Sequence, residues 1–541
     1  ARNIEQLDRP LSEVVAEGKL DEVPGVGEAL SKKVQELLST GELPYLDKLR
    51  SEVPEGLVRM LEVPDVGPKT AMLVHQELGV SSVEELKAAA LAHRIRGVKG
   101  LGEKTEERIL QGIKVLESKG DRMLLGEALP MAEEYVEYLR SSQRVDRVSV
   151  AGSLRRGRDT IGDIDILVGD DDPGSVIAAF AAYPAVEAVL MKGPTKCSVR
   201  LDGGMQVDLR AVETKSYGAA LQYFTGSKEH NVALRRIGVE MGLKLNEYGL
   251  FERDSGRMVA GATEEEVYSA LGLAYIPPEI RENSGEVEAA REGRMPELVR
   301  LDQVKGDLHV HTDWSDGSDT IGAVVAEAER RGYEYVAITD HSQSLRIANG
   351  LTPERLRMQV AAVRKAEDLA GGIVALAGSE VDILPDGSLD MPADVLNDLD
   401  IVIGSVHSRF KMDRAEMTKR VVAAISSGRI DVLGHPTGRL IGQRGPYELD
   451  LPAVLGAAAE HGVCVEVNCF PDRLDLRDAD CKAAGARGVR VSLGTDSHRV
   501  EHMGFIRLGV ITARRGWLGP GDVLNTMDAS RLAGHLSGRR P

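Results

Sequence analysis

The sequence predicts a multidomain protein with a helical N-terminal region, an α+β middle and a parallel α/β C-terminal half. Its 541 residues exceed one ordinary domain and suggest about three to four. Glycine-containing turns separate helical stretches in residues 1–120, and short alternating strands follow. From Gly306 onward, strands alternate with helices, which is typical of a parallel βα architecture. These patterns follow one another along the chain, so we expect separate domains.

The composition restricts the protein class only weakly. The net charge of −18 argues against a nucleic-acid partner, because phosphate binding relies on Lys and Arg. Acids gathered in metal sites would be offset by bound cations, however, so the motifs weigh more. The four cysteines show no C-x-x-C spacing and indicate buried thiols in a reducing cytoplasm. No apolar run of about 18 residues and no secretory signal occur, so we expect no membrane partner and a cytoplasmic, nucleoid-associated protein.

Three similar turns lie in the helical region, at Val23–Gly27, Val63–Gly67 and Val98–Lys104. They are similar to helix-hairpin-helix elements, which present backbone N–H groups at a helix N-terminus to a DNA phosphate. A single such turn is more often only a helix connection, but three in one segment favour duplex binding without sequence preference. The predicted DNA-binding residues here are Gly25, Gly27, Gly67, Lys69, Gly100, Gly102 and Lys104. The chain opens at ARNIEQL, which reads as the middle of a helix, so we expect that an N-terminal piece is missing.

The stretch VSVAGSLRRGRDTIGDIDILV, residues 148–168, reads as a strand, a Gly-Ser turn, a basic step and a second strand. On that second strand Asp163 and Asp165 are spaced i and i+2, so both carboxylates face one side. Two such carboxylates repel each other unless a cation lies between them, and Mg²⁺ is typically held by one or two carboxylates plus substrate phosphates. A lone D-x-D is more often a solvated strand face.

Neighbouring residues favour the metal site over the solvated strand face. Gly152, Ser153 and Arg156 would offer a close backbone approach, a hydroxyl and a planar cation to a phosphate chain. Asp208 lies in QVDLRAV, another strand-like stretch, and would bring a third carboxylate beside the first two. The segment therefore predicts a site for a hard cation and a polyphosphate.

The motifs GSLRRG, GDIDIL, VDLR and YFTGSKEHNVALR, followed by KLNEYGLF, together resemble the palm and thumb of family X DNA polymerases. The resemblance implies catalytic aspartates at Asp163, Asp165 and Asp208 with Mg²⁺ or Mn²⁺, and contact of Arg235 with the templating strand. The nucleotide-binding residues that it implies are Gly152, Ser153, Arg156, Gly162, Tyr223, Phe224, Gly226 and Asn231.

Two positions depart from the family pattern. Gln206 stands where the family commonly has a basic residue, two places before the third aspartate. Asp21 and Glu22 stand where members that remove 5′-deoxyribose phosphate have a Schiff-base lysine directly before the first hairpin, and Lys19 is displaced from it. We therefore predict no lyase activity.

The second half of the chain carries nine of the twelve histidines, and six of them lie at the ends of predicted strands. His309 and His311 share one strand face, as do Asp496 and His498. Polar residues at the C-termini of successive parallel strands are where such barrels place their active sites. Imidazoles with a few carboxylates suit Zn²⁺, Mn²⁺ or Fe, and nine ligands could hold three ions. The remaining histidines, His461, His502 and His535, are expected to be ordinary packing residues.

These motifs resemble the PHP (polymerase and histidinol phosphatase) family over residues 304–541. The resemblance implies a distorted (βα)7 barrel that hydrolyses phosphate esters, with every ligand position of the family pattern retained. The implied ligands are His309, His311, Asp316, His341, Glu380, His407, His435, Asp496 and His498. The two halves together resemble bacterial family X polymerases.

We therefore predict a DNA-repair enzyme that fills short gaps and trims 3′ ends by exonuclease, 3′-phosphatase or abasic-site cleavage. Its partners would be gapped or primer-template DNA and deoxynucleoside triphosphates, and we expect a monomer. Two alternatives are a small-molecule phosphatase that resembles histidinol phosphatases and a non-catalytic DNA end-binding scaffold. The expected domains are an N-terminal helical domain (1–55), fingers (56–120), palm (121–212), thumb (213–283), linker (284–303) and PHP hydrolase (304–541).

Overall fold

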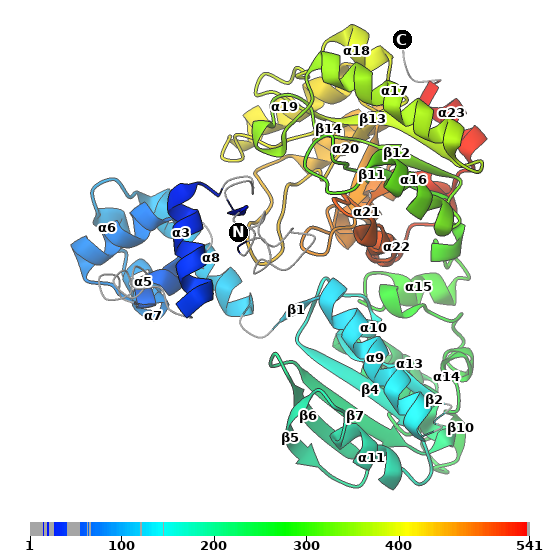
Figure 1. Cartoon of the computed structure of the whole chain (residues 1–541). Coiled ribbons are helices and arrows are strands. Elements are labelled where there is room, and N and C mark those ends of the chain that lie inside the picture. Colours follow the sequence, from blue (N-terminus) through cyan, green and yellow to red (C-terminus); the bar gives the residue numbers. More distant parts are fainter. Residues whose placement is uncertain are drawn as a thin grey trace. The chain divides into compact units, whose positions relative to one another are not determined.

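The computed structural model of the chain describes residues 15, 19–20, 26–40, 55–61, 63, 66–119, 122–143, 145 and 147–537. The chain forms two compact units, residues 1–120 with 442–444 and residues 121–441 with 445–541 (Figure 1). The predictions for Gly25 and for Asp21–Glu22 concern residues outside the described part of the chain. The predicted fold class is confirmed in both units.

The first unit is helical, as predicted. Its core contains Val74, Leu86 and Ile109, which pack together from three different helices. Glycine precedes three of the helices, and the Gly67 and Gly102 carbonyls accept the first intrahelical bonds from Ala71 (3.0 Å) and Glu106 (3.1 Å). The described helices are α3 (Glu28–Thr40), α5 (Glu55–Met60), α6 (Pro68–Leu78), α7 (Val83–Leu91) and α8 (Glu103–Lys119), with a short helix η2 at Ile95–Gly97.

The described part of the palm is a five-stranded sheet in the order β2-β4-β7-β6-β5, in which β4 and β7 run parallel and the other neighbours antiparallel. Helices α9 and α11 cover one face, because the alternate residues Ile164, Ile166 and Val168 point toward them. The predicted Gly-Ser turn is instead a four-residue helix, α10. The elements are β1 (Met123–Leu124), α9 (Leu125–Gln143), β2 (Arg147–Val150), α10 (Gly152–Arg155), β3 (Thr160–Ile161), β4 (Asp163–Gly169), α11 (Gly174–Ala181), β5 (Val186–Lys192), β6 (Lys196–Leu201) and β7 (Gln206–Val212).

The thumb packs its own helices and a three-stranded sheet around Leu234, Leu250 and Tyr268. Helix α12 contacts the palm face opposite α9, where Tyr217 and Leu221 pack against Leu167. The elements are η3 (Thr214–Ser216), α12 (Tyr217–Thr225), α13 (Lys228–Glu240), β8 (Leu243–Asn246), β9 (Gly249–Glu252), β10 (Met258–Ala260), α14 (Glu264–Ala270) and η4 (Pro278–Ile280).

The segment 284–303, expected to be a linker, is folded. It contains helix α15 (Glu286–Arg291), and Val287, Ala290 and Leu298 belong to the apolar core of the thumb. The segment is rich in charged residues, which suggested a linker. Its few apolar side chains nevertheless share one buried face. This connection therefore extends the thumb up to the next domain.

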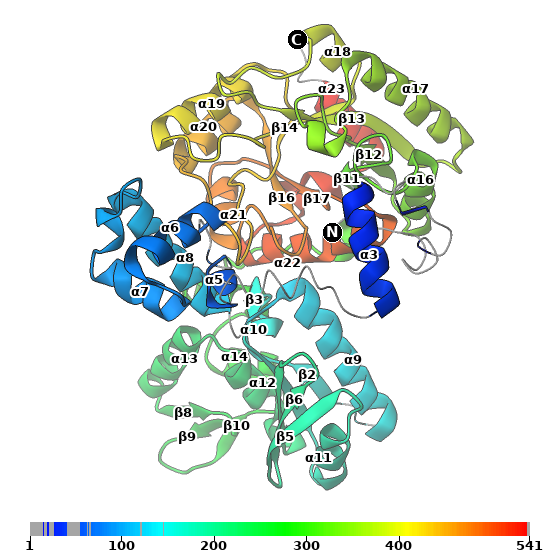
Figure 2. The ribbon, with the colours of Figure 1, turned by 60° about the vertical axis from the view of Figure 1, so that its left-hand side comes forward.

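The C-terminal half forms a parallel seven-stranded sheet in chain order, β11 to β17, with helices between the strands (Figure 2). A bridge between Val310 and Ser497 joins the two edges, so the barrel is nearly closed. The strands are β11 (Gly306–Val310), β12 (Tyr335–Ile338), β13 (Val374–Asp382), β14 (Ile401–Ser405), β15 (Val432–Leu433), β16 (Cys464–Asn468) and β17 (Val491–Gly494). The helices are η5 (Leu301–Gln303), α16 (Ile321–Arg330), η6 (Arg346–Ala348), α17 (Pro353–Leu369), α18 (Ala393–Asn397), α19 (Arg414–Ser426), α20 (Leu451–His461), α21 (Asp478–Gly485), η7 (Val500–Phe505), α22 (Ile506–Arg515), η8 (Pro520–Asp522), η9 (Leu524–Thr526) and α23 (Ala529–Ser537).

Palm and barrel share apolar packing within the second unit. Leu474 and Leu508 of the barrel half belong to the palm core cluster that contains Tyr135 and Ile164. The four cysteines, Cys197, Cys464, Cys469 and Cys481, are buried as expected. Within the described ranges, no helix is both long and apolar enough to cross a membrane.

A buried ion cluster joins the palm to the thumb. The Glu264 carboxylate accepts hydrogen bonds from Arg155 Nη1 (2.8 Å) and Arg281 Nη1 (2.5 Å), and the Arg281 side chain has no exposed area. Burial disfavours the charged form of Glu264, yet the two guanidiniums lower its pKa to about 2. The cluster fixes α10, which follows β2, against α14.

We expect Glu264→Ala to destabilise the protein by about 3–5 kcal/mol, because it leaves two cations without their counter-ion, one of them fully buried. The apparent free energy of the urea transition, followed by circular dichroism, measures this. The exposed neighbour Glu265 offers the control, since Glu265→Ala should change the value by less than about 0.5 kcal/mol. Because the folded-state pKa of Glu264 is depressed, its contribution is complete above the ordinary carboxyl pKa and is lost as pH falls toward 2. Equal losses in both variants would contradict the assignment.

Candidate functional site

The strand register brings the three palm aspartates together. Asp165 on β4 lies directly opposite Asp208 on the parallel strand β7, and Asp163 stands two residues before Asp165. One carboxylate oxygen of each lies within 4.8 Å of the others. The three face away from α9 and α11, because the intervening residues of both strands point toward those helices. The arrangement predicted from the D-x-D spacing is therefore present.

The electrostatics of this cluster favour a bound cation. Burial, followed by the neighbouring carboxylates of Asp163 and Asp208, raises the pKa of Asp165 to about 7. Asp208 Oδ1 is buried and accepts no hydrogen bond, whereas its Oδ2 accepts one from Gln206 Nε2 at 3.0 Å. A metal ion would satisfy the free oxygen and offset the repulsion, so the donor set fits a hard divalent cation.

Gly152 permits a close approach to this cluster. Its φ is +62°, and a Cβ there would lie 2.2 Å from Asp165 Oδ2. Any other residue would both strain the backbone and displace the carboxylate. The Ala151 N–H also donates to the Asp165 carbonyl at 2.8 Å, so the start of α10 is fixed on β4.

A cavity of about 660 Å³ adjoins the carboxylates, between palm and thumb. Most of the predicted nucleotide-binding residues and Arg235 line it, but Gly162 does not. Gly162 lies instead against Arg122, whose guanidinium contacts the strand β3. The lining also includes residues that the motifs did not indicate. The lining residues are Arg122, Gly152, Ser153, Arg156, Arg158, Asp163, Asp165, Tyr223, Phe224, Gly226, Ser227, Lys228, Glu229, Asn231, Arg235 and Glu282.

Asn231 holds the end of α12, which carries the predicted nucleotide-binding residues Tyr223 and Phe224. Its Nδ2 donates to the Tyr223 carbonyl at 2.7 Å, and its Oδ1 accepts from Gln222 Nε2 at 2.7 Å. The Phe224 ring stacks under the Arg210 guanidinium, 4.7 Å from the ring centroid. The end of α12 is therefore fixed before any nucleotide binds, with Tyr223 half-buried at the cavity wall.

The hairpins of the first unit expose the groups that were predicted to contact DNA. Lys69 and Lys104 are exposed just inside α6 and α8, and Gly100 has a φ of +94° that favours glycine. Buried Glu106 ties the third hairpin together by accepting bonds from Arg96 N (3.0 Å) and Arg96 Nε (2.7 Å). The N-termini of α6 and α8 can therefore donate backbone N–H groups to phosphate oxygens.

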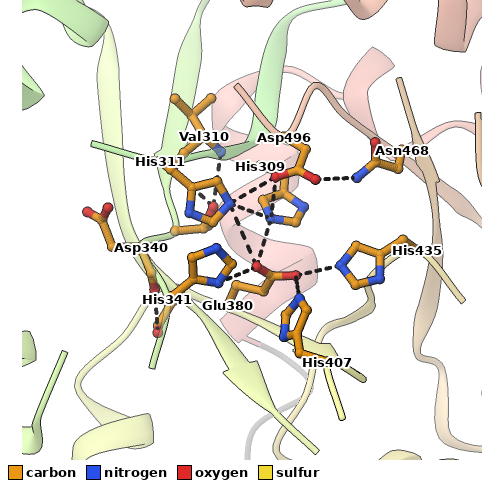
Figure 3. A network of polar contacts seen from close by, with 12 residues as sticks. His309, Val310, His311, Asp340, His341, Glu380, His407, His435, Asn468 and Asp496 are labelled. Atoms are coloured by element: carbon orange, nitrogen blue, oxygen red, sulfur yellow. Dashed lines mark hydrogen bonds and ion pairs between the residues drawn. The ribbon is translucent and has the colours of Figure 1, made fainter. Parts of the chain in front are cut away.

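In the barrel the predicted ligands converge on Glu380, which lies on β13 (Figure 3). Glu380 Oε2 lies 2.8 Å from His341 Nδ1, 3.5 Å from His309 Nε2 and 3.7 Å from His311 Nε2. Its Oε1 lies 2.8 Å from His435 Nε2 and 3.4 Å from His407 Nε2. One carboxylate thus bridges five imidazoles.

The ligands form three overlapping groups. His311, Asp316, His341 and His498 make the first, His309, His311 and Asp496 the second, and His341, Glu380 and His407 the third. In each group the ligand atoms lie within 4.8 Å of one another. His435 joins the third group through Glu380. All nine predicted residues therefore lie together at the C-terminal ends of the barrel strands.

This donor set fits metal ions rather than a closed hydrogen-bond network. Glu380 Oε2 is buried and has no partner with hydrogen-bond geometry, although three ring nitrogens point toward it. Burial disfavours protonated His309, yet Glu466 and Glu380 raise its pKa well above the ordinary value. Burial and the neighbouring His341 lower the pKa of His311 to about 4. Carboxylates thus raise the pKa of one ligand imidazole, whereas burial and a second imidazole lower the pKa of another.

A second layer of residues that the motifs did not indicate orients the ligands. Glu466 Oε1 lies 2.6 Å from His309 Nδ1, and Asp382 Oδ1 lies 2.6 Å from His407 Nδ1. Asn468 Nδ2 donates to Asp496 Oδ2 at 3.0 Å, and Arg473 Nε lies 3.4 Å from the same oxygen. Carboxylates behind metal-binding imidazoles fix the tautomer and the ring orientation. Asp382 could have been predicted, since it shares a strand face with Glu380.

The histidines expected to be ordinary packing residues lie outside this network. His502 and His535 are half-buried, and His502 stacks on Phe505. His461 is exposed at the end of α20, so its expected place among buried residues is wrong.

Three parts of the chain match known protein families. Residues 57–114 match the SAM-like helix-hairpin-helix tandem, residues 220–282 the DNA polymerase beta thumb and residues 307–468 the PHP domain. The chain is 28% identical over 291 residues to DNA polymerase lambda of Rattus norvegicus, which is 48% of each protein. It is 31% identical over 208 residues to the probable phosphatase YcdX of Escherichia coli O1:K1 / APEC, covering 37% of this chain and 80% of that protein.

A further relative extends over almost the whole chain. The DNA polymerase/3'-5' exonuclease PolX of Bacillus subtilis (strain 168) is 39% identical over 527 residues, which cover 97% of this chain and 92% of that protein. A match of this extent covers both the palm and the barrel. The chain therefore belongs to the PolX family of bacterial family X DNA polymerases with a C-terminal PHP domain.

Proposed function

We propose that the protein is a DNA-repair polymerase that fills short gaps in its palm site and trims 3′ ends in its barrel site. The observation that carries this proposal is the register of Asp165 opposite Asp208, with Asp163 beside them, at the wall of a cavity of about 660 Å³. A template-directed polymerase needs this combination of a metal site and room for a nucleotide. The full-length likeness to a polymerase with exonuclease activity supports it.

In the palm, Asp163, Asp165 and Asp208 would hold Mg²⁺ or Mn²⁺, which when bound supplies charge neutralisation for the triphosphate and for the attacking 3′-oxygen. Gly152 and Ser153 at the start of α10, and Arg156 just after its end, orient the triphosphate. Tyr223, Phe224 and Gly226 hold the sugar and base, and Asn231 keeps the end of α12 in place. Arg235 lies at the cavity wall, where it would contact the templating strand.

In the barrel, the nine ligands would hold Zn²⁺, Mn²⁺ or Fe, which supplies hydroxide for phosphoester hydrolysis when bound. Glu466 and Asp382 keep His309 and His407 oriented. Arg473, whose Nε lies 3.4 Å from Asp496 Oδ2, would place a positive charge near the site where a phosphate would bind. The likeness to a probable phosphatase favours 3′-phosphate removal as a second reaction of this site.

The remaining parts of the chain fit one DNA substrate. The glycine-capped helices of the first unit would bind the duplex beside a gap through its backbone, with Gly27, Gly67, Lys69, Gly100, Gly102 and Lys104 as contacts. We propose that the substrates are gapped or primer-template DNA and deoxynucleoside triphosphates. We also propose that the protein acts as a monomer. A barrel phosphatase that ignores DNA would leave these features and the palm site without a role.

We expect Asp208→Ala to reduce nucleotide incorporation by at least about 100-fold, because the carboxylate aids charge neutralisation worth several kcal/mol. Extension of a labelled primer in a one-nucleotide gap measures incorporation, and primer shortening without nucleotides measures hydrolysis in the same preparation. Hydrolysis should stay within about twofold of the wild type. Asp202→Ala, on the exposed turn after β6, serves as the control. Loss of both activities in Asp208→Ala would refute the separation of the two sites.

The double variant His309→Ala, Asp496→Ala should show the converse behaviour. Both residues belong to one ligand group, so primer shortening and release of 3′-phosphate should fall by at least about 100-fold. Incorporation in the gap should continue at the wild-type rate. His461→Ala, on the barrel surface, provides the matched histidine control. Primer degradation at the wild-type rate would remove the barrel as the nuclease.

A further inference from the structure

Two adjacent arginines at the end of α10 have different partners. Arg155 binds Glu264 through both terminal nitrogens, at 2.8 and 2.6 Å, and Thr225 Oγ1 at 2.7 Å. Arg156 instead lines the nucleotide cavity, where its Nε donates to Glu282 Oε1 at 3.1 Å and its Nη1 to the Thr225 carbonyl at 2.5 Å. Arg155 is thus occupied in the palm-thumb ion cluster, and Arg156 is the one of the pair that lines the cavity.

Glu282 is shared by three guanidiniums. Its Oε1 lies 3.1 Å from Arg156 Nε, 3.1 Å from Arg515 Nη1 and 3.7 Å from Arg158 Nη1. Arg156 and Arg158 come from the palm, and Arg515 comes from α22 of the barrel. A carboxylate with several cationic partners can release one of them without remaining unpaired.

Arg515 also fixes the backbone that carries Arg156. Its Nη1 donates to the Arg156 carbonyl at 2.6 Å and contacts the Glu279 carbonyl at 3.3 Å, and its Nη2 donates to Asp478. Its side chain is only 4% exposed. Arg515 belongs to none of the barrel metal groups, so hydrolysis does not explain its position.

The turn after Arg156 sits closely on α22. Gly157 has a φ of +65°, and a Cβ there would lie 2.1 Å from Ile511 Cγ2, one turn before Arg515. Leu508 of the same helix belongs to the palm core. Close packing and the hydrogen bonds of Arg515 therefore hold one short loop from two sides.

We propose that Arg515, acting with Glu282, is a positioning residue for the incoming nucleotide, so that the hydrolase barrel completes the polymerase site. The inference rests on the proposed role of Arg156 in triphosphate binding. Arg515 fixes the Arg156 backbone and competes for Glu282. When Arg156 turns to a triphosphate, Glu282 keeps Arg515 and Arg158 as counter-ions. Without Arg515, Glu282 would hold Arg156 more tightly and the loop would lose an anchor.

The test is single-nucleotide gap filling by the full-length protein with Arg515→Gln. The KM for the deoxynucleoside triphosphate should rise about tenfold, the effect of losing one charge-assisted contact, while kcat stays within about twofold. Arg515→Lys keeps the charge, so its KM should lie between the wild-type value and that of Arg515→Gln. Primer shortening without nucleotides should stay at the wild-type rate and reports that the barrel is folded.

Arg514 supplies a matched control on the same helix. It binds Glu279 Oε1 at 2.7 Å and the Val299 carbonyl at 2.9 Å, and no contact joins it to Arg156. Arg514→Gln should therefore leave the KM for the nucleotide unchanged. An equal rise in both variants would mean that α22 acts only as general support, and would overturn the inference.

A double-mutant cycle with Arg156→Ala separates this inference from the proposed function. Arg156→Ala should itself raise the KM, and adding Arg515→Gln should then have no further effect, because Arg515 acts through Arg156. A wild-type KM in both Arg515→Gln and Arg515→Lys, or an undiminished effect of Arg515→Gln in the Arg156→Ala background, would overturn the positioning role. A wild-type KM in Arg156→Ala alone would instead remove the proposed role of Arg156, and the inference with it.

Discussion

Both sites depend on a fold that holds ionisable side chains close together. In the palm these side chains are carboxylates, and in the barrel they are imidazoles and carboxylates. In the palm, the ladder between β4 and β7 places three carboxylates within 4.8 Å. Ladder hydrogen bonds and apolar residues on the opposite face keep the strands in this register, so the aspartates cannot move apart. Burial, and then the repulsion of Asp163 and Asp208, raises the pKa of Asp165 to about 7. A divalent cation relieves this repulsion, which makes metal binding a consequence of the fold.

The barrel also holds ionisable side chains close together, but most of its donors are imidazoles. Here Glu380 bridges five imidazoles, and Glu466 and Asp382 hold two of the rings from behind. The barrel site offers mainly imidazoles and the palm site only carboxylates, which is why we propose different ions for the two sites. One chain can thus hold two kinds of ion and direct them to opposite reactions at a DNA 3′ end. Helix α22 packs on the palm core through Leu508. It connects the two sites but contributes no residue to the described ligand groups.

Local spacing allowed much of this to be predicted. The i and i+2 rule placed Asp163 with Asp165 and His309 with His311, because strand geometry is set over two residues. Contacts between distant segments could not be predicted in the same way. Glu466 lies 157 residues from His309, and Arg515 lies 233 residues from Glu282. Residues 284–303 looked like a linker because their few apolar residues show a common face only once α15 forms.

The central claim is that two independent groups of ligands bind metal in this one chain. Mn²⁺ binding to the full-length protein, measured by electron paramagnetic resonance, tests it most directly when the wild type is compared with Asp163→Asn, Asp165→Asn and with His309→Ala, Asp496→Ala. We predict that each double variant loses only the ions of its own site and that the two losses add. Simultaneous loss of all ions in either variant, or no loss in either, would contradict the account.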